Sequence, residues 1–148
     1  MRRVIFRVAG VAESQGSTRS QPYVRPDGTA GSRTRSANPK LNDWRQRVGN
    51  TALAVRRGIF FDRETAVDVR LIFYLPRPQS TPKRIEYPIR KPDIDKLERA
   101  ILDALTNVLW VDDAQVTDVT KRKRFAPGGT CYVAISVSEM PSGGRNPA

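Results

Sequence analysis

The ten residues AVDVRLIFYL, at positions 66–75, constrain the fold more than any other part of the chain. They first alternate between apolar and polar residues and then become continuously apolar, with β-branched and aromatic side chains. Such a run is typical of a largely buried strand. Pro76, Pro78 and Pro82 end the strand, and the polar segment 77–92 predicts a mobile basic loop.

Further strands are expected at residues 3–9, 116–125 and 130–137. The first resembles part of a secretion signal, but Arg7 interrupts its apolar stretch, which favours a strand. The residues 127–129, Pro-Gly-Gly, predict a turn between the last two strands. We therefore expect those two strands to pair as a hairpin.

Two helices are indicated by apolar residues that recur at spacings of three and four. The second follows Pro92, where Asp95 stands at the N-cap position and Glu98, three residues later, completes a D-x-x-E capping box. The first helix lies within 40–57, and its expected core residues are Leu41, Trp44, Val48, Ala52 and Val55. Those of the second helix are Leu97, Ile101, Ala104, Leu105 and Val108.

The order strand, helix, strand, helix, strand, strand predicts an α+β fold, a single domain with a mixed β-sheet of about four strands packed with two main helices. We expect the domain to span 1–140, with a disordered tail at 141–148. Residues 13–39 are interpreted as a basic flexible loop, and plain disorder is the alternative; a long loop in a compact domain is more often functional. Tyr23 offers a stacking surface among its arginines. These arginines are Arg19, Arg25, Arg33 and Arg35.

The chain is strongly basic, with 26 Lys and Arg residues against 15 Asp and Glu residues. This charge favours a polyanion such as nucleic acid as the partner, although a merely well-solvated basic surface is the alternative. Because the chain has no histidine, a Ser-His-Asp triad and His-ligated metals are excluded. The single cysteine, Cys131, excludes an intrachain disulfide and a multi-cysteine zinc site, and is expected in the core.

Acidic residues are concentrated in one segment, KPDIDKLERAILDALTNVLWVDDAQV, at 91–116. Part of this has a structural explanation: the capping box uses Asp95 and Glu98, and Asp95 would pair with Arg99 one helical turn away. One aspartate of VDDAQ would suit an N-cap or an Asx-turn. The aspartates of the segment are Asp93, Asp95, Asp103, Asp112 and Asp113.

The remaining aspartates favour a second interpretation. Clustered carboxylates bind a hard cation such as Mg²⁺, which would activate water and offset charge on a phosphate. A helix of roughly 13 residues, about 20 Å long, separates Asp95 from Asp113. Either the helix ends early, or a second subunit completes the site.

The stretch PDIDKLERAILDALTNVLWVDDAQV strongly resembles the core of the RusA-type Holliday junction resolvases, the crossover junction endodeoxyribonucleases. The shared pattern is D-x-D, a leucine two positions on, DAL within the helix and DD-x-Q-V, followed by Lys123 on the next strand and the Gly128-Gly129 turn. It covers residues 91–129. The resemblance implies a RusA-like fold and a homodimer that resolves four-way DNA junctions by paired cuts, in recombination and repair. The implied cofactor is Mg²⁺, with Mn²⁺ as an alternative.

The resemblance also implies roles for single residues. Asp93, Asp95 and Asp113 would be the essential, metal-binding acids. The family's catalytic lysine falls on Arg99, which keeps the charge but does not readily transfer a proton; Lys96 would supply an ammonium instead. Asp103 and Asp112 are expected to have structural or supporting roles. The residues expected to bind DNA are Lys91, Lys121, Lys123 and the loop arginines Arg19, Arg25, Arg33 and Arg35.

On this interpretation the protein acts on branched DNA in the cytoplasm of a bacterial or phage-infected cell, associated with the nucleoid, and is not secreted. The alternative is a non-enzymatic, basic nucleic-acid-binding protein whose aspartates are only structural. The two hypotheses differ in one respect: only the enzyme requires the aspartates for metal-dependent cleavage.

Overall fold

The computed structural model describes residues 1–16, 18–36 and 40–141, without the side chains of 18–23 and 32–36. The tail predicted to be disordered therefore lies, apart from Pro141, outside the described residues. None of the helices within these ranges is both long and apolar enough to cross a membrane.

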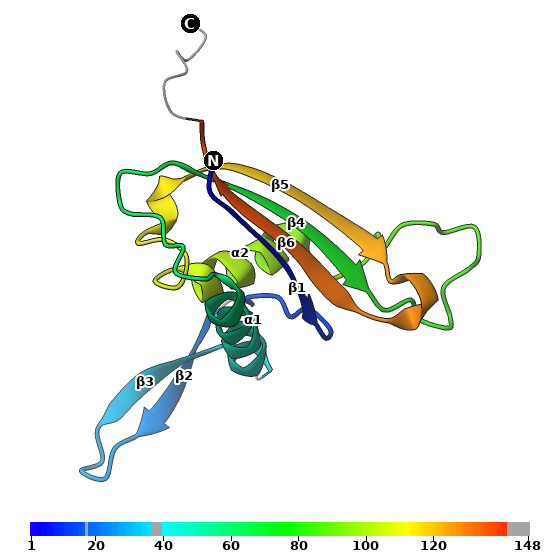
Figure 1. Ribbon diagram of the computed structural model, residues 1–148. Helices are drawn as coiled ribbons and strands as arrows, with labels where there is room; N and C mark the ends of the chain where they lie inside the picture. Colours follow the sequence, from blue (N-terminus) through cyan, green and yellow to red (C-terminus); the bar gives the residue numbers. More distant parts are fainter. Residues whose placement is uncertain (17, 37–39, 142–148) are drawn as a thin grey trace, which may run out of the picture.

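A mixed sheet of four strands, in the order β1-β6-β4-β5, forms the centre of the fold (Figure 1). β1 (Arg3–Ala9) pairs antiparallel with β6 (Tyr132–Glu139), which pairs antiparallel with β4 (Val67–Leu75). β5 (Val116–Phe125) lies parallel to β4 on its other side. The predicted buried strand thus lies inside the sheet, and the predicted α+β class with two helices is confirmed.

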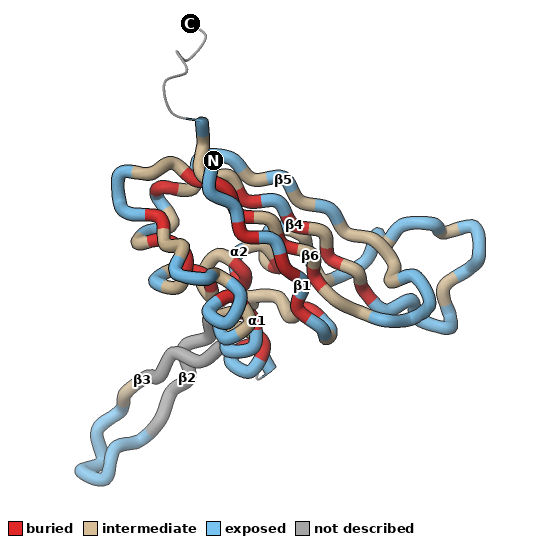
Figure 2. The backbone as a smooth tube through the Cα atoms, in the orientation of Figure 1, coloured by how far each residue is buried: buried red, intermediate tan, exposed pale blue. Residues whose placement is uncertain are grey.

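One face of the sheet carries the core. Buried and more exposed residues alternate along β1, β4 and β6, as Figure 2 shows, because successive side chains of a strand point to opposite faces. Helices α1 (Leu41–Val55) and α2 (Ile94–Leu105) contribute their apolar stripes to the same buried cluster. The two helices approach closely at Gly49, where an added Cβ would lie 3.3 Å from the carbonyl oxygen of Ala104.

The predicted hairpin between the last two strands is wrong. β5 and β6 do not pair, because β4 lies between them. β6 buries Val133, Ile135 and Val137 and therefore takes an interior place in the sheet. The corresponding face of β5 carries Lys121 and Lys123, which suit an edge strand.

Residues expected to form a flexible loop instead hold a second, two-stranded sheet. β2 (Thr18–Val24) and β3 (Ala30–Ser36) pair antiparallel, and the ribbon extends away from the main sheet (Figure 1). The turn contains Gly28, whose φ of +87° suits glycine. Asp27 accepts bonds from the hydroxyl and the backbone N–H of Thr29 at 2.6 and 3.0 Å, and the hydroxyl chiefly lowers the pKa of Asp27.

Two residues predicted in the core lie outside it, while Ala104 and Val108 pack against it only partly buried, and Val108 follows the end of α2. Cys131 is only half-buried, because it precedes β6 in the turn, with its Sγ 3.9 Å from the carbonyl oxygen of Gly129. Val55 is 38% exposed, since it occupies the last turn of α1 before the chain turns away at Arg57 and Gly58, both with positive φ. The other predicted core residues of α1 are buried.

Arg2 and Glu139 join the beginning of the chain to the end of β6. The backbone N–H of Arg2 donates to the Glu139 carboxylate at 2.6 Å, and the guanidinium forms an ion pair with it at 3.2 Å. These contacts, the backbone bond first, lower the pKa of Glu139. The contribution of these contacts to the free energy of unfolding is fully present above the ordinary pKa of a glutamate. It is lost as the pH falls through the lowered pKa of Glu139.

Phe73 lies fully buried in β4 and should be essential to the core. Phe73→Ala is expected to lower the free energy of unfolding by about 3–5 kcal/mol, since it leaves a cavity between the sheet and the helices. Ile5→Ala is the matched control, because Ile5 is 67% exposed on β1. Urea denaturation followed by circular dichroism measures both; equal losses would contradict this assignment of the core.

Candidate active site

Two predicted acids lie together in sequence at the amino end of α2. Asp93, not Asp95 as predicted, is the N-cap residue, and its side chain makes no capping bond. Asp95 is in the first turn of the helix, and both residues are exposed. Within the described part of the chain neither carboxylate has a hydrogen bond or an ion pair. The helix dipole stabilises negative charge here, and both carboxylates are free to bind a cation.

Two lysines of β5 fix this end of α2. The ammonium of Lys123 donates to the carbonyl oxygens of Arg90 and Pro92, at 3.0 and 2.9 Å, and so holds the main chain immediately before Asp93. Lys121 forms an ion pair with Glu98 of α2. Glu98 therefore faces β5 and does not close the predicted capping box, because Asp93 has taken the N-cap position.

Asp113 lies at the opposite end of α2. Its Oδ1 accepts a hydrogen bond from the hydroxyl of Thr106, the residue that caps the helix, and another from Nε1 of the buried Trp110 at 3.0 Å. Both bonds use the same oxygen, and among the described residues Oδ2 has no hydrogen-bond partner. The carboxylate is thus held in place with one oxygen available, beside an open hollow. That hollow is lined by Arg45, Asp103, Thr106, Asn107, Val111, Asp112 and Asp113.

The turn that carries Asp113 is organised by Gln115. The side-chain oxygen of Gln115 accepts from the backbone N–H groups of Val111 and Asp112 at 2.9 and 3.0 Å. Its amide nitrogen donates to the carbonyl oxygens of Asp62 and Thr65 at 2.6 and 2.9 Å. One nearly buried side chain therefore joins this turn to the loop before β4.

Asp112 is the N-cap of the short 3₁₀ helix η1 (Asp113–Gln115), and its carboxylate accepts from the N–H of Ala114 at 2.9 Å. This confirms that one aspartate of VDDAQ has a capping role. Asp112 also lies 3.9 Å from the exposed guanidinium of Arg63, too exposed a pair to contribute much stability. Its role in the turn is therefore structural.

The two groups of acids are too far apart to share an ion within one chain. From Asp95 to Thr106 the axis of α2 rises about 16 Å, whereas Mg²⁺ takes its ligands at about 2.0–2.1 Å. In the ranges that the structure describes, no three acidic or cysteine side chains form a group that could hold a metal ion. The helix ends at Leu105, so its early end does not bring Asp113 back to Asp93. The described residues of one chain therefore do not bring the three predicted acids together.

The comparisons agree with the motif around α2. The family model described as Endodeoxyribonuclease RusA matches residues 15–136, which is most of the chain. The chain belongs to the RusA endodeoxyribonuclease family. No curated protein matches it significantly. The matched range includes both ends of α2, so the family resemblance of 91–129 is confirmed and the chain is assigned to a family of DNA-cutting hydrolases.

The other residues to which the RusA resemblance gives a role are less constrained. Arg99 is exposed, and the ion pair predicted between it and Asp95 is not formed. Lys96 is half-buried, and its carbonyl oxygen accepts from the N–H of Gln15 at 3.0 Å. Both belong to the end of α2 that carries the exposed aspartates. Asp103 lines the hollow beside Asp113.

The residues predicted to bind DNA have varied surroundings, and their DNA-binding role stays a prediction. Lys121 and Lys123 have the internal partners described above, and Lys91 is exposed. Arg25 donates to the carbonyl oxygen of Ala30 at 2.9 Å and so supports the β2–β3 turn. The side chains of Arg19, Arg33 and Arg35 lie outside the described residues.

Sequence reasoning missed Thr106 and Trp110, which hold Asp113, and the bonds made by Gln115. A signal for Gln115 was present: Asp112-x-x-Gln115 is itself a capping-box pattern. For Trp110 there was no such signal, because the sequence does not show the direction in which the indole N–H points. In a RusA-family chain, hydrogen-bond donors shortly before the DD pair are therefore candidates for positioning its second aspartate.

Gln115→Leu should lower the free energy of unfolding by about 3 kcal/mol or more, because it leaves buried backbone groups without partners. Asp112→Asn is the control, since asparagine caps about as well as aspartate and should change stability by less than about 1 kcal/mol. Thermal and urea unfolding measure both. A Gln115→Leu protein as stable as the control would show that the side chain does not organise the turn.

Proposed function

We propose that this protein is a Mg²⁺-dependent, structure-specific endodeoxyribonuclease that resolves four-way DNA junctions by paired cuts in opposing strands. Membership of the RusA family supports DNA cleavage. The observation that carries the metal-dependent part is a pair of exposed carboxylates, Asp93 and Asp95, that have no bond to any other described residue, on a chain with a formal net charge of +11. The proposal includes a role in recombination and repair, in the cytoplasm at the nucleoid.

The active site in this proposal is shared between two copies of the chain. A two-fold axis across the middle of α2 would bring the amino end of one α2 to the carboxyl end of the other. Each site would then hold Asp93 and Asp95 of one protomer and Asp113 of its partner. Such an arrangement is self-complementary and yields two identical sites, which matches the symmetry-related strands of a four-way junction.

The donor set suits Mg²⁺, which binds carboxylate oxygens and often takes only one or two from the protein. An ion bound there supplies an activated water and offsets charge on the phosphate. The exposed guanidinium of Arg99, one helical turn beyond Asp95, is placed to bind a phosphate oxygen but not to move a proton. Lys123 positions Asp93 through its two carbonyl bonds.

Cleavage of a synthetic four-way junction with Mg²⁺ tests the activity. Asp93→Asn and Asp113→Asn are each expected to reduce the cutting rate about 100-fold or more, because they remove charge that stabilises the transition state. Junction binding in gel-shift assays should be retained. Asp118→Asn, an exposed aspartate of β5, is the matched control and should cut like the wild-type protein. A well-folded wild-type dimer that never cuts with Mg²⁺ would instead favour the non-enzymatic DNA-binding alternative.

Mixing two inactive variants tests whether the site is shared. If Asp113 acts with the partner's Asp93, a heterodimer of Asp93→Asn and Asp113→Asn chains contains one intact site and one site with both changes. The mixture should therefore regain single-strand nicking, whereas each variant alone stays inactive. If all three acids acted within one chain, both sites of the heterodimer would be damaged and mixing would restore nothing.

A further inference from the structure

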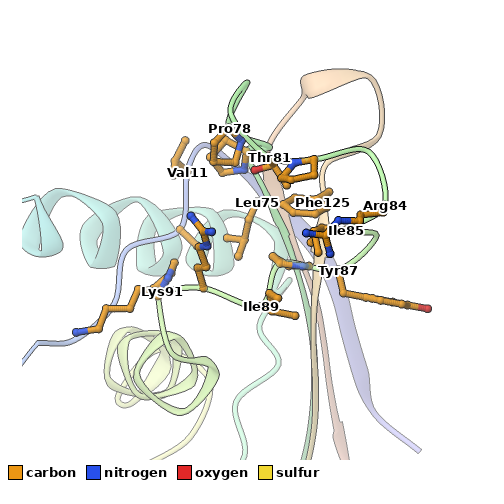
Figure 3. Close-up of a pocket in the computed structure, with 16 residues that line it drawn as sticks. Val11, Leu75, Pro78, Thr81, Arg84, Ile85, Tyr87, Ile89, Lys91 and Phe125 are labelled. Carbon is orange, nitrogen blue, oxygen red and sulfur yellow. The ribbon is translucent and has the colours of Figure 1, made fainter.

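An apolar pocket of about 270 Å³ lies directly before Asp93 in the chain (Figure 3). One wall is the proline-rich loop that links β4 to α2, and its last lining residue, Pro92, is bonded to Asp93. The opposite wall comes from Val11, Leu75 and Phe125. The function proposed above makes no use of this pocket.

The wall formed by the loop is held by hydrogen bonds. Arg77 donates to the carbonyl oxygens of Ile85 and Pro82, at 2.9 and 2.8 Å, and its guanidinium lies 4.7 Å from the centre of the Phe125 ring. Lys123 holds the far end of the loop through its two carbonyl bonds. The sequence predicts a mobile loop here, and in the structure these hydrogen bonds hold the loop in place as one wall of the pocket.

The mouth of the pocket is cationic. Arg84, Arg90 and Lys91 line it and are exposed, and among the described residues their side chains have no hydrogen bond or ion pair. Figure 3 shows Arg84 and Lys91 on opposite sides of the pocket. None of the described residues that line it is acidic. A ligand that suits both parts presents an apolar face to the pocket and carries negative charge beside it.

We propose that this pocket takes one nucleobase, unstacked from the DNA close to the scissile phosphate. Unstacking is least costly where bases are already strained or unpaired, as at a branch point. Contact with apolar and aromatic side chains then stabilises the base, while the cations at the mouth bind its flanking phosphates. The proposal rests on the proposed function, because that function places the scissile phosphate at Asp93, the residue that directly follows the pocket residue Pro92.

The test measures binding, with Asp113→Asn protein so that no DNA is cut. A set of four-way junctions carries a single abasic nucleotide, placed in turn at each position around the branch point. The abasic nucleotide at the captured position should weaken binding by about fivefold to 150-fold, the contribution of one stacked base, and other positions should have little effect. An equal effect at every position would overturn the proposal.

Two variants connect that position to the pocket. Val11→Trp fills space in the pocket from the wall opposite the loop, and Ile89→Asp places a carboxylate among the lining residues; both residues are exposed, so folding should be preserved. Each should bind the intact junction as weakly as the abasic one. Leu53→Trp, at an exposed position of α1 outside the pocket, should keep the wild-type difference. Sensitivity to the abasic position that persists in both pocket variants would overturn the proposal.

Two further outcomes separate the explanations. If Val11→Trp converts a dimer into a monomer in gel filtration while the abasic effect is unchanged, the pocket holds a segment of the second copy and the proposal is wrong. If the abasic effect follows the pocket variants but the wild-type protein cuts no branched DNA with Mg²⁺, base capture is supported and the proposed catalytic function fails.

Discussion

The rigidity of α2 is the constraint on which the rest of the site depends. The helix is buried along one face by Leu97, Ile101 and Leu105, so it does not bend or shift without loss of the core. Its length then fixes the separation between the exposed aspartates at one end and Asp113 at the other. Among the described residues, β5 contacts the amino end of α2, and the turn around Gln115 carries Asp113 at the carboxyl end.

Several basic residues have a structural use as well as their charge. Lys123, Arg77 and Arg25 each donate to main-chain carbonyl oxygens, and Lys121 pairs with Glu98. These contacts hold the β4–α2 loop, the β2–β3 turn and the amino end of α2 in place. The excess of positive charge in the sequence therefore does not by itself identify which residues meet DNA. Exposed cations such as Arg84, Arg90 and Lys91, which have no hydrogen bond or ion pair within the described part of the chain, are the better candidates.

The sequence predicted the helices and the main strands well, since apolar periodicity marks them directly. It predicted a wrong pairing of β5 with β6, because strands that are neighbours in the chain usually form a hairpin. In the structure the apolar β6 takes an interior place in the sheet, and the lysine-bearing β5 takes an edge. The strands β2 and β3 were missed although Pro26-Asp27-Gly28 is a turn sequence, because the polar flanking residues hid the pairing. At the site, the motif identified the acids, but the bonds that hold Asp113 depend on side-chain direction, which spacing does not give.

The placement of acids at opposite ends of α2 has a consequence for control of the enzyme. On the proposed two-fold arrangement, a newly made subunit carries only two incomplete halves and is harmless to the chromosome. Competence to hydrolyse a strand then arises with assembly, so abundance of the protein sets when it becomes active. An arrangement of this kind would restrict cleavage to the assembled dimer without an inhibitor or a covalent modification.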